Sequence, residues 1–418
     1  MSAAVAGVLA GHQVTVFEAA QTLGGRARAL PCRMPDGTTA TLDNGQHILI
    51  GAYSETLRVL QLVGIAPARA FLRLPLRMVF PDGGGLRLPR WPPPLDALAG
   101  IGLARGWSLA DKAALLRVAL RWHVGGFACD GATSVAELCK GLTPRPMAEL
   151  IEPLCVSALN IAPAEASGQV FLRVLHDSLF GGRGASNLLL PRMDLSNLFP
   201  QAAARWITQR GAQVHRGARV QPRWAADTGW QLGDARFDQV LLATAAPDAA
   251  RLVEGASVGL AGAALAGARA WCARAQDLQH TAIATVYAWG RGVGLAQPMI
   301  ALRGQASGPP GALAQFVFDR GQLGGPPGLL AFVVSASSAD RNVIEQQVLE
   351  QARTELGLVL TPVQTVVEKR ATFACVPGLQ RPPMQIAPGL RASGDYVQGP
   401  YPATLEAAVR AGVAAMQS

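Results

Sequence analysis

The feature that most constrains the fold is a helix followed by a strand at the start of the chain, closed by an acidic residue. Ser2 to Ala10 is an alanine-rich stretch typical of a helix, and Gly11 supplies an ordinary helix stop. His12 to Glu18 then alternates β-branched and apolar residues, which predicts a strand that ends in an acid. In a dinucleotide-binding strand–helix–strand unit, an acid at this place accepts hydrogen bonds from a ribose. Any α/β unit with a solvent-facing Glu18 would show the same pattern.

Two glycine-containing motifs that follow make the dinucleotide interpretation more specific. Gly24 and Gly25 allow the backbone to come close to a ligand, and Arg26 beside them can pair with a diphosphate. The motif LDNGQH, residues 42–47, then opens a short strand-like run from Ile48 to Ile50. A glycine pair alone is weak support. The ordered set of strand-acid, glycine pair with arginine, and LDNGQH favours a nucleotide-binding α/β domain.

Composition places the chain among globular proteins with a large core. Of its 418 residues, 50% are apolar and 16% are charged, which excludes a disordered chain. The longest uncharged stretch of the alanine- and glycine-rich middle, Gly255 to Ala268, has 14 residues, fewer than the ~20 that a membrane-spanning helix needs. The six cysteines form no CxxC pair and lie at no metal-ligand spacing from a histidine, so we expect no metal site.

The formal net charge of +9 comes from 37 basic and 28 acidic residues. No basic block interleaved with aromatic residues is present, so we expect no nucleic-acid partner. The charge fits either a solvated basic surface or attraction to anionic lipid headgroups. The first residues lack the basic segment of a secretory signal, which favours a cytoplasmic protein.

The chain alternates between α/β and helical character along its length. From about residue 72 to 185, proline-rich sequence leads into helical patterns rich in leucine, tryptophan and arginine. Residues 198–245 return to an α/β pattern. Three strand-like segments, a helix at Val343–Leu356 and a strand at Val363–Lys369 then predict a mostly antiparallel sheet with helical cover. The segment SGD, residues 393–395, and an alanine-rich helix that opens at PATLE close the chain.

The order of these motifs resembles a known protein superfamily over nearly the whole chain. Strand-acid, LGGRA, LDNGQH, the strand segment VLLAT, and the terminal SGD and PATLEAAVRAG are similar to the flavin-containing amine oxidases and phytoene desaturases. Two segments, LDNGQHILIGAYSETLRVL and LLLPRMDLSNLFP, resemble the squalene-associated branch of that superfamily, the hydroxysqualene dehydroxylases.

The resemblance implies an α/β fold, in which a Rossmann-like FAD-binding domain is interleaved with a substrate domain built from a mixed sheet and helices. We assign residues 1–71, 190–262 and 385–418 to the first domain and residues 72–189 and 263–384 to the second. A dinucleotide-binding unit begins with a strand and a GxGxxG turn, about 20 residues before the acid. Neither precedes the first helix here. We therefore expect an N-terminally truncated domain whose first strand and glycine-rich turn lie within an upstream extension of roughly 15–25 residues.

The resemblance also implies FAD as the cofactor and a set of residues that hold it. Glu18 would bind the adenosine ribose, Gly24, Gly25 and Arg26 would lie along the diphosphate and ribityl chain, Val220 would offer backbone groups to the adenine, Gly394 and Asp395 would reach the ribityl or diphosphate, and Leu405 and Glu406 would begin a helix whose amides point at the flavin. Positive charge at the start of that helix would stabilise the reduced, anionic flavin.

In the branch that the chain resembles, hydroxysqualene, a C30 isoprenoid alcohol, is reduced to squalene by a hydride from the flavin. The allylic hydroxyl leaves most easily when protonated, so the site needs a proton donor and a dry apolar tunnel. Asp43 and His47 flank the LDNGQH loop and are the candidate donors. His47 could instead be a structural or flavin-contacting histidine, and Asp43 a turn-capping carboxylate. Tyr396 and Tyr401 are weaker candidates.

Two alternative functions stay open: a carotenoid or phytoene-type desaturase that runs the flavin oxidatively, and a catalytically inactive flavoprotein-like subunit of a squalene-synthesising assembly. Hydroxysqualene is the expected substrate, and other squalene-synthesis enzymes are expected partners. The segment Leu86–Trp122 carries arginines and tryptophans among leucines, which fits an amphipathic helix on the inner face of the cytoplasmic membrane. A helix that covers the protein's own core, with arginines that reach to solvent, fits the same pattern.

Overall fold

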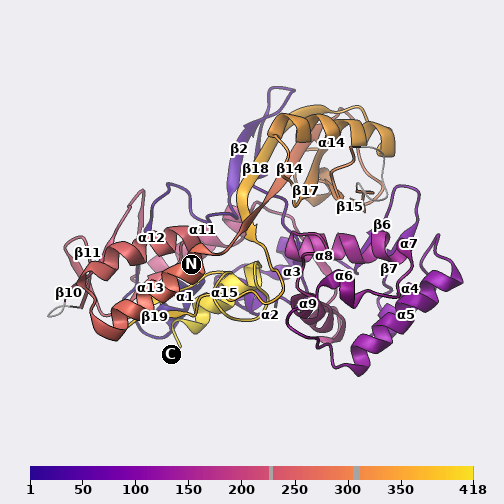
Figure 1. Ribbon diagram of the computed structural model, residues 1–418. Helices are drawn as coiled ribbons and strands as arrows, with labels where there is room; N and C mark the ends of the chain where they lie inside the picture. The colour runs from indigo at the N-terminus through magenta and orange to yellow at the C-terminus, as the bar shows by residue number, and fades with distance from the viewer. Residues whose placement is uncertain (226–228, 305–310, 418) are drawn as a thin grey trace.

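The start of the chain folds as the sequence pattern predicts. The computed structural model describes residues 1–225, 229–304 and 311–417 (Figure 1). The predicted helix and strand are α1 (Ser2–Leu9) and β1 (Thr15–Glu18). β1 pairs in parallel with β9 (Gln213–Arg216), which follows α11 (Pro200–Thr208) in the stretch predicted to have an α/β pattern. Apolar side chains of α1 and α11 share one buried cluster with Val14 and Val16, so the helices cover this small sheet.

The end of the chain returns to this first unit. The predicted terminal helix, α15 (Leu405–Ala414), packs on α1, because Val409 and Val413 join the same buried cluster as Val5. The letters N and C accordingly lie in the same region of Figure 1. Two segments at opposite ends of the sequence thus build one side of the molecule.

A second parallel pair consists of β13 (Val240–Leu242) and β20 (Leu390–Ala392). β13 is the predicted VLLAT strand, and β20 leads directly into the SGD motif. β1 and β13 both line one cavity, and within the described residues each of them has a strand partner on one side only. The further strand expected upstream of α1 stays a prediction.

The middle of the chain is helical, as the sequence pattern predicts, and lies at the right of Figure 1. Its helices are α4 (Leu95–Gly102), α5 (Leu109–Val124), α6 (Val135–Leu138), α7 (Pro144–Pro146), a π-helical turn (Met147–Ile151), α8 (Glu152–Leu159) and α9 (Gly168–Phe180). α5 begins at a capping box, in which the side chains of Ser108 and Asp111 each accept a hydrogen bond from the other's backbone amide. β8 (Leu188–Pro191) then pairs with β4 (Leu49–Ile50), which ties this part to the LDNGQH segment.

An antiparallel sheet of five strands, in the order β15-β16-β17-β14-β18, confirms the predicted sheet with helical cover. β14 (His280–Trp289) pairs with β17 (Leu329–Ser335), the central strand, on one side and with the edge strand β18 (Thr361–Phe373) on the other. α14 (Arg341–Leu356) covers one face, where its apolar side chains pack against those of β14. Figure 1 shows this sheet and α14 at the top of the molecule.

Several elements have no counterpart in the sequence-based prediction. They are a hairpin of β2 (Ala29–Arg33) and β3 (Thr39–Asp43), the helices α2 (Ser54–Leu62), α3 (Pro67–Ala70), α10 (Leu195–Leu198), α12 (Ala246–Ala256) and α13 (Gly262–Gln276), and the strands β5 (Phe71–Leu74), β6 (Arg77–Val79), β7 (Gly85–Arg87), β11 (Gly229–Leu232), β12 (Ala235–Phe237), β15 (Met299–Ala301) and β19 (Gln385–Ala387). β10 (Pro222–Ala225) lies within residues 198–245, where the sequence predicts an α/β pattern. β16 (Phe316–Asp319) is the second of the three strand-like segments that the sequence predicts for this sheet.

The two-domain boundaries stay a prediction. α13, which the predicted boundary assigns to the substrate domain, shares a buried cluster with α12 and β19 of the predicted FAD-binding domain. Trp271 of α13 donates a hydrogen bond of 2.8 Å to the carbonyl of Pro383, just before β19.

Candidate functional site

The motifs predicted to bind a nucleotide meet around one cavity of about 1760 Å³. Its walls come from the start of α1, the LGGRA and LDNGQH loops, β13, the SGD turn and the start of α15. The predicted site residues that line it are Glu18, Gly24, Gly25, Arg26, His47, Val220, Gly394, Asp395 and Leu405. Asp43 and Glu406 are not part of the lining. The ordered motifs, although far apart in sequence, therefore build a single site.

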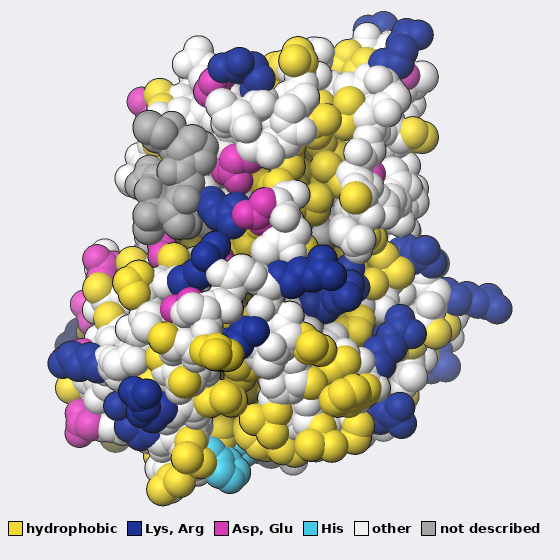
Figure 2. Space-filling view, turned by 90° about the vertical axis from the view of Figure 1, so that its right-hand side faces the viewer, with side chains coloured by type: hydrophobic (Ala, Val, Ile, Leu, Met, Phe, Trp, Pro, Cys, Tyr) yellow, Lys and Arg dark blue, Asp and Glu magenta, His cyan; other side chains and the backbone are white. Residues whose placement is uncertain are grey.

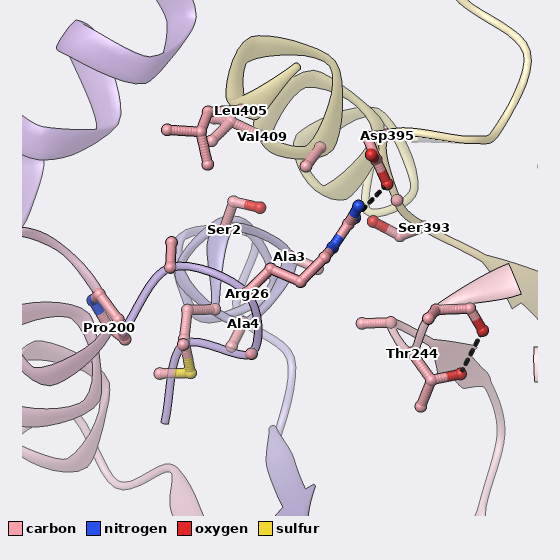
Figure 3. A pocket seen from close by; sticks show the side chains of 18 of the residues that line it. Ser2, Ala3, Ala4, Arg26, Pro200, Thr244, Ser393, Asp395, Leu405 and Val409 are labelled. Atoms are coloured by element: carbon pink, nitrogen blue, oxygen red, sulfur yellow. Dashed lines mark hydrogen bonds and ion pairs between the residues drawn. The ribbon is translucent and has the colours of Figure 1, made fainter. Parts of the chain in front are cut away.

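Arg26 and Asp395 form the central polar contact of this cavity. Arg26 Nη2 lies 2.6 Å from Asp395 Oδ1, and Arg26 Nη1 donates to the carbonyl of Ala371 at 2.6 Å. Figure 3 shows the Arg26 side chain reaching across the pocket to Asp395, with Ser2 and Ala3 of α1 nearby. A guanidinium in this position can pair with both a carboxylate and a phosphate oxygen, because it carries five donors in one plane.

Gly24 and Gly25 are required to be glycine for different physical reasons. Both adopt positive φ, 116° at Gly24 and 56° at Gly25, where other residues are strained. A Cβ on Gly24 would lie 2.4 Å from the carbonyl oxygen of Ala27, so the fold of the turn itself excludes a side chain there. A Cβ on Gly25 would meet no atom within 4 Å, so its side faces open space in the cavity. Gly25 is therefore the position where a ligand can approach the backbone closely.

Glu18 and Val220 lie at the outer part of the same cavity. Glu18 ends β1, and its Oε1 accepts a hydrogen bond of 2.8 Å from the amide of Ala20, which orients the carboxylate. Val220 lies in the loop between β9 and β10, after Arg216, which is paired with Glu18. The carboxyl ends of β1 and β9 thus place both residues at one edge of the cavity, as expected for strand ends in a parallel sheet.

His47 faces the cavity and is held by its own loop. Its Nδ1 lies 2.9 Å from the carbonyl oxygen of Gly45. Because a carbonyl only accepts, Nδ1 carries the hydrogen, and Nε2 is the lone-pair nitrogen of the neutral ring. Burial lowers the pKa of His47 below its usual value, so the neutral ring is favoured. In this state Nε2 is the ring nitrogen through which His47 can take up a proton and pass it on.

Asp43 lies behind the loop rather than in the cavity. Its Oδ1 accepts a hydrogen bond of 2.8 Å from the amide of Leu195, at the start of α10. Its Oδ2 lies 3.6 Å from Nη2 of the buried Arg320. Burial raises the pKa of Asp43 to about 6, although the Leu195 amide and the Arg320 charge lower it. This geometry fits the capping alternative and gives Asp43 no contact with the cavity.

Arg320 and Tyr287 support the LDNGQH loop, and sequence reasoning missed both. Arg320 Nη1 donates to Oε1 of Gln46 at 3.0 Å, and the Tyr287 hydroxyl donates to the backbone oxygen of Asp43 at 2.9 Å. Both lie in or beside the five-stranded sheet, with Tyr287 on β14 and Arg320 after β16. Neither carries a local motif, so no sequence signal pointed to them.

The two residues at the start of α15 point in different directions. Leu405 lines the cavity. Glu406 is fully buried, and its carboxylate accepts hydrogen bonds from the amides of Glu55 and Thr56 at 3.0 and 2.9 Å and from the Thr56 hydroxyl at 2.7 Å. Arg410 Nε also donates to it, at 2.7 Å. The Glu406 side chain therefore caps the N-terminus of α2, and only its backbone is left for the role predicted from the sequence.

The donor set of the cavity fits a dinucleotide cofactor. Asn44 lines the cavity, and its Nδ2 is buried without a hydrogen-bond partner, so an acceptor is lacking at that point. Arg26 supplies positive charge, Gly25 leaves the backbone open, and Glu18 supplies an acceptor for hydroxyl groups. The first turns of α1 and α15 also line the cavity, and helix N-termini favour anions. These groups match the phosphates and ribose of FAD.

Comparison with known proteins supports FAD as the cofactor. Residues 1–417 match the family described as flavin containing amine oxidoreductases. The hydroxysqualene dehydroxylase of Sinorhizobium fredii is 26% identical over 443 aligned residues, which cover 99% of this chain and 94% of the relative. The hydroxysqualene dehydroxylase of Rhodopseudomonas palustris is 27% identical over 436 residues, with the same shares covered.

A solved structure has the same fold at low sequence identity. The oxidoreductase from Methanosarcina mazei superimposes with a TM-score of 0.71 at 16% identity, over 100% of this chain and 97% of the other. Together with the full-length family match, this confirms the resemblance inferred from the motifs. The chain belongs to the flavin containing amine oxidoreductase family and is an FAD-dependent oxidoreductase.

Proposed function

We propose that the protein reduces hydroxysqualene to squalene, by replacing an allylic hydroxyl group with hydride. The observation that carries the proposal is the similarity to two hydroxysqualene dehydroxylases over 99% of the chain, combined with one cavity that joins the nucleotide-binding motifs to apolar walls. FAD, when bound in its reduced form, supplies the hydride. The protein's own residues bind the cofactor and substrate, exclude water and transfer a proton to the leaving hydroxyl group.

The residues assigned to the cofactor are those that line the cavity at its polar end. In this proposal Arg26, with Asp395, positions the diphosphate and ribityl region, and Glu18 holds the adenosine ribose. Gly25 leaves room for close approach of the cofactor to the backbone. Val220 and the start of α15 at Leu405 complete the set. Glu406 does not line the cavity and is assigned to the set only through its backbone amide at the start of α15, because its carboxylate is used by α2.

The isoprenoid chain is assigned to the apolar walls near the LDNGQH loop. Ile48, Ile50, Ala158, Val174 and Ile283 line the cavity there. They come from the loop and β4, from helices α8 and α9, and from β14. Such walls bind a hydrocarbon chain and keep water from a developing allylic cation.

His47 is the proposed proton donor to the leaving hydroxyl group. The lowered pKa makes the protonated ring a stronger acid than an ordinary histidine, once Nε2 has taken up a proton. The bond from Nδ1 to Gly45 fixes the ring, so Nε2 is the atom that transfers the proton. Asp43, the other candidate, has no access to the cavity. The Tyr401 hydroxyl donates to Asp177 at 2.6 Å and Tyr396 does not line the cavity, so both remain weaker candidates.

Two other functions have weaker support. A carotenoid or phytoene-type desaturase would use the same fold oxidatively, but the relatives that align over nearly the whole chain are both hydroxysqualene dehydroxylases. A catalytically inactive subunit of a squalene-synthesising assembly would leave the cavity's unpartnered Asn44 amide without purpose. Association with other squalene-synthesis enzymes, and peripheral contact with the inner face of the cytoplasmic membrane, remain part of the proposal.

The deciding experiment is anaerobic incubation of the purified protein with hydroxysqualene and chemically reduced FAD, with the products read by mass spectrometry. Formation of squalene is expected, and the Asp395→Ala variant should form much less at limiting FAD. New conjugated double bonds under oxidising conditions would favour the desaturase instead. A protein that binds flavin yet forms neither product would overturn both, and failure to bind flavin would favour the inactive subunit.

A further inference from the structure

Helix α5 has apolar side chains on two opposite faces. Its core-facing residues, at the spacing of one helix face, are Asp111, Ala114, Leu115, Val118 and Trp122. Its exposed apolar residues at the same spacing on the opposite side are Leu109, Ala113, Leu116, Leu120 and Val124, and the exposed Arg117, Arg121 and His123 flank them. A helix that merely covers a protein core places charged residues on its outer face. Here Leu109, Leu120 and Val124 are 84%, 61% and 79% exposed, so the outer face is apolar.

The neighbouring helix α4 extends this apolar surface. Leu95 and Leu98 of α4, Trp91 before it and Leu103 directly after it are all at least half exposed. α4 packs beside α5, and Figure 1 shows the two helices at the edge of the helical part, away from the nucleotide-binding motifs. Figure 2 faces this side and shows hydrophobic side chains gathered in its lower part, with Lys and Arg side chains around them. We call the exposed apolar residues of Trp91–Val124 the α4–α5 face.

Within residues 87–124 the exposed charged side chains are basic. They are Arg87, Arg90, Arg105, Arg117 and Arg121. The acidic residues within 87–124 are Asp96 and Asp111, and both are buried. Asp96 accepts from the amide of Ala97, and Asp111 is held by the α5 cap and by Thr143. The surface is therefore apolar with a basic rim.

We propose that the α4–α5 face docks on the surface of a bilayer that contains anionic lipids. Exposed leucines on a helix that lies in the interface enter the acyl boundary, and arginines beside them pair with headgroup phosphates. Within the described residues no helix is long and apolar enough to cross a membrane, which agrees with attachment to one leaflet. A second copy of the chain is a poorer occupant, because a symmetric contact would bring two basic rims together. The proposal deepens the proposed function, since its substrate dissolves in lipid.

The structure also corrects the expectation about which residues of this segment can contact a bilayer. The sequence pattern suggested tryptophans at an interface, yet Trp107 and Trp122 are buried. Trp107 donates to Glu149 at 2.8 Å and Trp122 to the carbonyl of Leu138 at 3.3 Å. Both interpretations of the segment are therefore partly right, because one side of α5 covers the core and the other side faces outward. Trp91 and the exposed leucines carry the proposed contact.

The test is sedimentation of the purified full chain with vesicles of phosphatidylcholine alone or mixed with phosphatidylglycerol. We expect binding to the mixed vesicles that weakens at high salt, because exposed charge pairs are screened. Leu116→Glu with Leu120→Glu should lower the partition constant at least about tenfold. The matched control is Val258→Glu with Val359→Glu, which changes residues that are 90% and 83% exposed elsewhere and should bind as wild type.

A second pair of variants tests the basic rim. Arg90→Gln with Arg117→Gln should lower binding to the mixed vesicles only, whereas Arg269→Gln with Arg274→Gln, exposed residues of α13, should not. Unchanged binding by the leucine variant, or equal loss in its control, would overturn the proposal, with thermal melting showing that each variant is folded. A concentration-dependent dimer that the leucine variant abolishes would assign the face to a second copy instead. No substrate or turnover enters these assays, so their failure leaves the dehydroxylation proposal intact, and the reverse also holds.

Discussion

Arg26 and Asp395, 369 positions apart in the chain, form an ion pair of 2.6 Å inside the cavity. The pair joins the LGGRA motif to the SGD motif, and Nη1 of Arg26 donates a hydrogen bond to the carbonyl of Ala371 on β18. These contacts fix three segments of the cavity relative to one another. One segment lies near each end of the chain, and the third belongs to the antiparallel sheet. The contact also keeps a charged donor at the place where the cofactor's polar chain is expected.

Asp395→Ala should weaken FAD retention. The change removes a charged hydrogen-bond partner from the cavity, which costs about 1.5–3 kcal/mol of binding free energy. It also leaves Arg26 without its carboxylate. Bound flavin per protein, measured from the absorbance after gel filtration, should fall, while Glu350→Gln, which removes a carboxylate from an exposed ion pair, should retain full occupancy. Unchanged occupancy and affinity in the Asp395 variant would remove this residue from the site.

His47→Ala should slow turnover with little loss of bound FAD. A positioned general acid contributes about 10²–10⁴-fold to the rate, and the alanine variant cannot transfer a proton at this position. The measurement is the single-turnover rate at saturating reduced FAD, with His215→Ala, an exposed histidine on β9, as the control. A wild-type rate in the His47 variant would show that the proton comes from elsewhere.

Glu406→Gln should destabilise the fold rather than release the cofactor. The fully buried carboxylate accepts hydrogen bonds from two amides and a hydroxyl of α2 and from Arg410, and an amide replaces an acceptor oxygen by a donor. Hydrogen bonds to a charged group contribute about 1.5–3 kcal/mol, so the unfolding midpoint in denaturant should fall clearly. Flavin occupancy of the folded variant should stay near wild type. Loss of flavin without loss of stability would restore the cofactor role predicted for this side chain.

Local motifs predicted residues that line the polar end of the cavity because each motif places its group through its own turn or strand end. A strand-acid, a glycine pair with positive φ and a turn after β20 each place a group at a strand or helix end, and parallel packing brings those ends together. By contrast, the directions in which the Glu406 and Asp43 side chains point depend on hydrogen bonds to residues far away in the sequence. Their partners, Thr56 and Leu195, are about 350 and 150 residues away. Single buried residues such as Arg320, Tyr287 and Asn44 carry no pattern at all. Helix periodicity likewise found α5 but could not tell which of its two apolar sides faces the core.

The raised pKa of Asp43 predicts a stability that depends on pH. Burial raises the pKa from 3.8 to about 6, so the folded protein holds this proton where the unfolded chain has lost it. The favourable contribution is therefore complete below the unfolded value and is lost as pH rises through about 6, by up to about 3 kcal/mol. Asp43→Asn, which stays neutral, should become more stable relative to wild type as pH rises from about 4 to about 6.5 in thermal melting, and the difference should stay constant above that.

Glu55 provides the control of opposite sign. The hydrogen bond from Arg58 lowers the pKa of Glu55, so its contribution is present at neutral pH and lost as pH falls through the lowered value. Glu55→Gln should therefore lose stability relative to wild type as pH rises from acid to neutral. If Asp43→Asn changed with pH in the same direction as Glu55→Gln, the inference that burial dominates at Asp43 would be wrong.

The pair of Asp43 and Arg320 should behave as a coupled unit only when Asp43 is charged. Both side chains are buried, the carboxylate and guanidinium lie 3.6 Å apart, and Arg320 also holds Gln46 in the LDNGQH loop. Arg320→Gln leaves a buried carboxylate without its cation, so at pH about 7.5 it should cost more in wild type than in Asp43→Asn, with a coupling energy of about 0.5–3 kcal/mol. At pH about 4.5, where Asp43 is protonated in the folded state, the coupling should vanish. A double-mutant cycle from denaturant unfolding at the two pH values measures this. A coupling that is the same at both pH values would mean that Arg320 acts on the loop through Gln46 and not through the charge of Asp43.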